Sequence, residues 1–132
     1  MSLTTDDARM IADAFLDAAQ SIEDYIDLNY QQGQHKISRA EYEFLYESFQ
    51  TLLRISSYAT TAAVGLAIDT LDAPANDLKN VIEEAKQKIK NLQKISSVIL
   101  CVSALVSLAS SIISKDPKAI VTSINHLRKQ IL

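Results

Sequence analysis

The feature that most constrains the fold of this chain is a stretch of twenty residues without charge, from Ile95 to Ser114, between Lys94 and Lys115. Twenty helical residues are about enough to cross the hydrocarbon core of a bilayer. A helix that is apolar on nearly all sides is buried in a core, between subunits or in lipid. The stretch is therefore a central helix, an oligomer contact or a membrane-active segment.

The composition favours long helices in one domain. The chain has 132 residues but only two Gly and two Pro, which is too few for a turn-rich sheet. Its length and its apolar fraction of 48% predict a single domain over residues 1–132 with a substantial core. No linker or internal repeat divides it.

The net charge of −3 hides an uneven distribution. Residues 1–72 carry 12 acidic and 4 basic side chains, whereas residues 73–132 carry 4 acidic and 9 basic ones. Such asymmetry can mark a nucleic-acid or membrane surface, but no dense basic run accompanies it. We expect acidic and basic helices to lie side by side, and we expect no nucleic-acid partner.

Local signals place the helix ends. The first helix should begin after Thr4 or Thr5 and end near Gln31, before Gly33. Residues 38–41, Ser-Arg-Ala-Glu, match the capping box, so a second helix should begin at Arg39. Its later half, 55–68, is uncharged and should be enclosed.

The third helix is predicted to run without interruption from about Asp77 to Ser114, because no Gly or Pro occurs in that range. Pro74 favours a break before it, near residue 73. Asp116 as cap and Pro117 at the first helical position predict a fourth helix. The fold class expected is all-α: an antiparallel bundle of three long helices plus a shorter C-terminal helix.

The third helix has one apolar seam along its length and a second apolar face in its later half only. The seam combines two heptad positions: Leu78, Ala85, Leu92, Ile99, Val106 and Ile113; Ile82, Ile89, Ser96, Ser103 and Ser110. The second face begins after Lys94. We favour its burial by the fourth helix folding back, with a partner chain or lipid as the alternatives. Seven serines weaken the lipid reading.

No catalytic or metal-binding pattern emerges. Neither histidine, His35 or His126, has a Glu three residues earlier, as a bundle metal site would want. Cys101 lies inside the uncharged stretch, where a thiol acts as a small hydrophobe. Phosphate-binding, zinc and nucleophile motifs are missing. We therefore expect no enzyme activity, cofactor, metal or small-molecule substrate.

The leading hypothesis is a non-enzymatic helical interaction module that binds a protein partner or forms a homo-oligomer, such as an adaptor, chaperone or immunity-type protein. The residues expected at its partner or self-association face are Val98, Val102, Leu105, Ala109, Ile112, Ile120, Ile124 and Leu127. The alternative is a membrane-active protein whose apolar segments 55–68 and 95–114 are shielded until insertion. The N-terminus lacks a signal-peptide pattern, so a cytoplasmic location is expected and leaderless export stays open.

Overall fold

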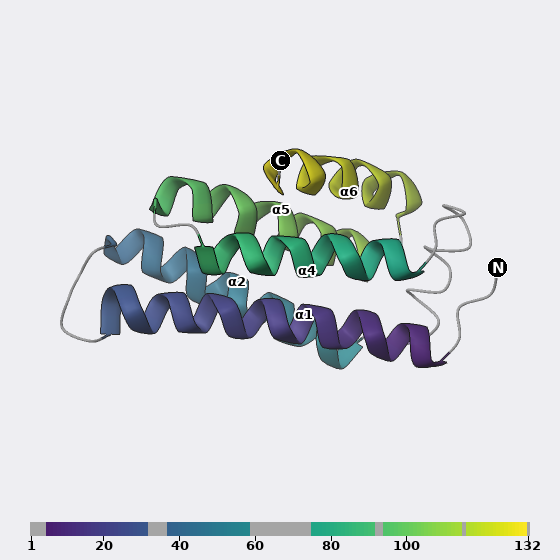
Figure 1. Ribbon diagram of the computed structural model, residues 1–132, viewed down its shortest axis with the longest axis horizontal. Helices are drawn as coiled ribbons and strands as arrows, with labels where there is room; N and C mark the ends of the chain where they lie inside the picture. The colour runs from purple at the N-terminus through teal and green to yellow at the C-terminus, as the bar shows by residue number, and fades with distance from the viewer. Residues whose placement is uncertain (1–4, 32–36, 59–74, 92–93, 115, 132) are drawn as a thin grey trace.

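The computed structural model describes residues 5–31, 37–58, 75–91, 94–114 and 116–131, and all regular structure in these ranges is helical (Figure 1). The elements are α1 (Thr5–Ile26), the π-helical turn η1 (Asp27–Gln31), α2 (Arg39–Tyr58), α4 (Ala75–Asn91), α5 (Ile95–Ser114) and α6 (Pro117–Ile131). The all-α bundle predicted from the sequence is confirmed. Gly33, His35 and most of segment 55–68 lie outside the described residues.

The bundle consists of two antiparallel hairpins, α1–α2 and α4–α5, with α6 added against the second (Figure 1). Helix α1 packs on α2 and α4, and α5 packs on α2 and α4, so these four helices enclose a shared core. Helix α6 turns back after α5 and covers the α4–α5 pair. Helix α5 thus packs against three helices, α2, α4 and α6. A helix at the edge of a bundle buries only one apolar side.

The uninterrupted third helix predicted for 77–114 is wrong. Helix α4 ends at Asn91, Lys94 is not helical, and α5 begins at Ile95 and runs back in the opposite direction. The backbone N–H groups of Ser97 and Val98 donate to the Lys94 carbonyl oxygen, at 3.1 and 3.2 Å, and open the new helix. A straight helix of that length, about 57 Å, would extend beyond neighbours able to cover its later half. Reversal brings that half into the core.

The reversal also changes which side of α5 faces inward. The predicted seam is buried along α4, at Leu78, Ile82, Ala85 and Ile89. In α5 the seam positions turn outward: Ser96 and Ser110 are exposed, and Ile113 is 41% exposed. The buried side of α5 is instead the second apolar face, because it carries more aliphatic volume than the serine-containing seam.

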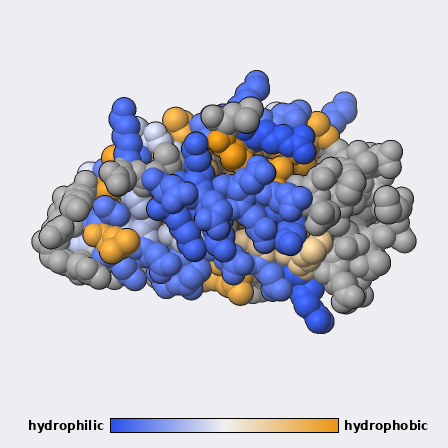
Figure 2. Space-filling model, viewed as in Figure 1, coloured by the Kyte–Doolittle hydropathy of each residue, from blue (hydrophilic) through white to orange (hydrophobic). Residues whose placement is uncertain are grey.

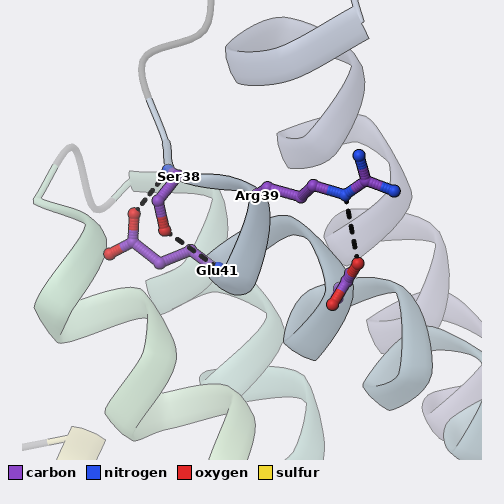
Figure 3. Close-up of polar contacts among 4 residues, drawn as sticks. Ser38, Arg39 and Glu41 are labelled. Carbon is purple, nitrogen blue, oxygen red and sulfur yellow. Dashed lines mark hydrogen bonds and ion pairs between the residues drawn. The ribbon is translucent and has the colours of Figure 1, made fainter.

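The predicted helix starts are confirmed where the signal was local. The Glu41 backbone N–H donates to Ser38 Oγ at 3.1 Å, and the Ser38 N–H donates to Glu41 Oε1 at 2.7 Å (Figure 3). Asp116 Oδ1 accepts from the backbone N–H of Lys118 at 3.2 Å, as a helix cap does. Between them, these caps fix where α2 and α6 begin.

The first helical segment ends at Gln31, as predicted, but its last turn is not α-helical. Its last turn, η1, is π-helical, and Asn29 Nδ2 donates to the Tyr25 carbonyl oxygen at 2.8 Å. A side chain that bonds the carbonyl one turn back competes with the backbone and loosens the α-helical ladder. The rings of Tyr30 and Tyr42 then stack with centroids 4.3 Å apart, which joins η1 to α2.

The acidic and basic halves meet as expected. Lys86 Nζ of α4 lies 3.8 Å from Asp17 Oδ2 of α1. The partly exposed pair adds only about 0–1 kcal/mol, so the contact aligns the helices more than it stabilises them. The side over α1 and α4 is mainly hydrophilic (Figure 2).

Candidate functional site

The residues predicted to bind a partner lie on the inward-facing sides of α5 and α6. All eight are buried in the single chain, from Leu105 at 0% exposed to Ile124 at 9%. Five of them lie on α5 and three on α6, and the two helices pack against each other. The cover expected from the fourth helix is therefore present, and a partner could reach these side chains only if the helices separated.

A buried hydroxyl pair joins α5 to α6. Ser111 Oγ lies 2.9 Å from Ser123 Oγ and 2.8 Å from the Ser107 carbonyl oxygen. A carbonyl only accepts, so the Ser111 hydroxyl donates to it, and Ser123 donates to Ser111. The pair satisfies two buried polar groups and fixes the register between the helices.

Cys101 belongs to the same inner side and is held as a neutral thiol. Its Sγ lies 3.7 Å from the Ala85 carbonyl oxygen of α4, and the residue is 1% exposed. Burial raises the pKa of Cys101 to about 11, and the charge of Lys88 only partly opposes this. Because the thiolate is the nucleophile, this site resists thiol chemistry at neutral pH.

The opposite side of α5 forms an uncharged surface, which we call the outer stripe. Leu100 is 53% exposed and Ile113 41% exposed, while Ile99 and Val106 are half-buried. The serines that share this side are Ser96, Ser103, Ser107 and Ser110. No residue of α5 carries a charge. The outer stripe is thus a neutral surface about 30 Å long, at 1.5 Å per residue.

The outer stripe differs from the prediction, in which Ile99, Val106 and Ile113 belong to a buried heptad seam. A usable signal was present. After Lys94 the second face is almost wholly aliphatic, whereas every other seam position is a serine. The more apolar of two faces is the one that folding buries first, so the seam should have been assigned to the surface.

A shallow hollow of about 540 Å³ lies beside α4, where α6 ends. Its lining is formed by Asn80, Glu83, Glu84, Lys86, Gln87, Lys88, Asn91 and Ile131. Two acidic and two basic side chains balance one another there, so the hollow attracts neither anions nor cations strongly. Lys79 Nζ lies 3.8 Å from Glu83 Oε1, so one of the two acidic side chains is paired within α4.

Among the described residues, no group of three or more His, Cys, Asp or Glu side chains could hold a metal ion. His126 lies exposed on α6. One helix of the described part, α5, is long and apolar enough to cross a membrane, and half of that span is buried within the fold. Such a helix is also what the core of a soluble bundle contains.

Comparison with known protein families, with curated proteins and with solved structures gives no match for this chain. Function must therefore be argued from the geometry of α5 and its surroundings.

Proposed function

We propose that the chain is a non-enzymatic helical interaction module and that the outer stripe of α5 is its contact surface. The observation that carries this proposal is the exposure of Leu100 and Ile113 on a helix side that bears no charge. Protein contact regions are depleted of charge at their centre and place apolar side chains there. The side over α1 and α4 supports this choice by contrast, because it is mainly hydrophilic (Figure 2).

The contact surface in this proposal is not the inner face predicted from the sequence. Val98, Val102 and Leu105 form part of the core that holds α5 in place. The outer stripe is accessible in the folded chain, so binding through it needs no unfolding. The inner face thus acts as scaffold, and the outer stripe as the binding surface.

The solution mass by light scattering, measured over a range of concentrations, tests this proposal. We expect the mass to rise above the 14.6 kDa of one chain, and Leu100→Glu to return it to the monomer with unchanged helical content. Leu100 is exposed, so the variant should fold. A wild-type mass of one chain at every concentration contradicts the proposal.

Membrane binding is the second candidate, and the length and composition of α5 favour it. It predicts that the protein floats with liposomes of anionic phospholipid and that mild detergent alters its mass. Protein that stays in the aqueous fraction at neutral and acidic pH would remove this candidate. Association that is independent of detergent would favour the outer stripe as a protein contact.

A further inference from the structure

The outer stripe repeats every seven residues, and this period indicates what can cover it. Ile99, Val106 and Ile113 recur at one heptad position, and Ser96, Ser103 and Ser110 recur at the other. A seven-residue repeat of this kind suits another helix, because it keeps the same side facing a partner along a left-handed pair. A flat protein surface or a lipid layer requires no such period.

Alternation of large and small side chains distinguishes the two possible directions of the partner helix. In a parallel pair of identical helices, Ile99 would meet Ile99 and Ser103 would meet Ser103, so wide and narrow layers would alternate. In an antiparallel pair with full overlap, each aliphatic residue meets a serine of the other copy. The facing pairs are then Ser96 with Ile113, Ile99 with Ser110, and Ser103 with Val106. Layers of equal volume pack without voids.

We infer that the partner of the outer stripe is a second copy of this chain, whose α5 lies antiparallel across a two-fold axis between Ser103 and Val106. This inference rests on the proposed function, since it names the occupant of the same surface. An isologous contact of this kind closes on itself and leaves no further free face. Serine permits close approach of the two backbones.

Charge is compatible with this arrangement. Neutral side chains of one copy meet neutral side chains of the other along the whole of α5. At each end, Lys94 of one copy would lie near Asp116 of the other, and water screens an exposed pair of this kind. The ends therefore contribute little, and the register depends on the fit of serine against aliphatic side chains.

The size of the contact predicts a weak dimer. A strip about 30 Å long and 10 Å wide covers about 300 Å² per copy, less than the roughly 800 Å² per partner of a stable interface. The dimer should therefore form and dissociate rapidly and become populated only at high concentration. Covalent trapping is the appropriate assay for such a contact.

Disulfide trapping with two single-cysteine positions tests the inference. The Cα atoms of facing residues should lie about 3.5–5.5 Å apart, given helix axes about 8–10 Å apart and a Cα radius of about 2.3 Å. This separation is within reach of a disulfide. The variants are Ser96→Cys and Ile113→Cys, both at exposed positions that folding tolerates. The native Cys101 is buried, so the wild type serves as the unreactive background.

We expect a mixture of Ser96→Cys and Ile113→Cys chains to form the mixed disulfide several-fold faster than either variant forms its own. Gln50→Cys, exposed on α2, gives the rate of random collision. Rapid self-linking of Ser96→Cys would show a parallel pair and overturn the inference. So would a mixture no faster than the Gln50→Cys control. If light scattering still shows association in those cases, only the antiparallel arrangement fails and the proposed function stands.

Discussion

Truncation of Leu105 to alanine should reveal whether the chain covers α5 by itself. Leu105 lies in the middle of α5 and has no exposed surface. Replacing a fully buried leucine by alanine costs about 2–5 kcal/mol, through lost transfer energy and the cavity left behind. This is a large part of the roughly 5–15 kcal/mol that stabilises a typical domain. With a urea slope of about 2 kcal/mol per molar, the unfolding midpoint should fall by about 1–2.5 M.

The assay is urea unfolding, followed by circular dichroism at two protein concentrations that differ widely. Because α2, α4 and α6 of the same chain surround α5, the difference in midpoint between wild type and Leu105→Ala should be the same at both concentrations; association through the outer stripe would raise both midpoints alike. Leu100→Ala is the matched control. Leu100 is 53% exposed, so its truncation should change stability by no more than about 0.5 kcal/mol. A Leu105→Ala variant as stable as wild type, or a difference in midpoint that changes with protein concentration, would refute burial within one chain.

Three further predictions concern the hydroxyl pair, the buried thiol and the α4–α5 turn. Ser111→Ala removes the acceptor of a buried Ser123 hydroxyl and should lower the free energy of unfolding by about 1–3 kcal/mol, measured by thermal or urea unfolding. Ser123→Ala should lower it less, because Ser111 keeps its bond to the Ser107 carbonyl. Burial raises the pKa of Cys101 from 9.0 to about 11, and the unfolded chain therefore loses the thiol proton first. Stability should be complete below pH 9 and fall as the pH rises toward 11, and unfolding of Cys101→Ala should show less of this loss. Lys94→Ser places a capping side chain at the start of α5 and should stabilise the protein by about 1 kcal/mol. Gln87→Ser, inside α4, should destabilise it by roughly 0.5 kcal/mol. Equal losses of stability at both positions would support a helix that continues through residue 94.

Sequence reasoning succeeded where short-range chemistry determines structure. The Ser38–Glu41 capping box and the Asp116–Pro117 start each involve neighbours in the chain, and both lie where they were predicted. The reversal before Ile95 has no comparable signal, since residues 92–94 contain no Gly, Pro or capping side chain. Helix propensity is a weak local preference that tertiary packing overrides. The break follows from the benefit of burying the later apolar face, which depends on helices distant in sequence.

The same reversal explains why the α5 residues of the partner face predicted from the sequence lie on the inner side of that helix. A periodic pattern identifies the sides of a helix but not which of them faces the core. For α4 the assignment was unambiguous, because one side is aliphatic and the other charged. For α5 both sides are uncharged, so the serines at alternate seam positions are the one sequence signal that distinguishes surface from core, and the packing of α2, α4 and α6 agrees with it.

The energetics of α5 constrain which functions the folded chain can perform. Five large aliphatic side chains of α5 are buried: Val98, Val102, Leu105, Leu108 and Ile112. At about 1.5–3 kcal/mol each, exposing them to water would cost roughly 8–15 kcal/mol, as much as the net stability of a typical domain, about 5–15 kcal/mol. Helix α5 therefore cannot leave the bundle while the rest stays folded. Any flotation with liposomes should appear only at a pH or temperature where the near-ultraviolet signal of the tyrosines is lost. Flotation of the fully folded protein would contradict this prediction. Contact through the outer stripe, by contrast, does not require α5 to leave the bundle.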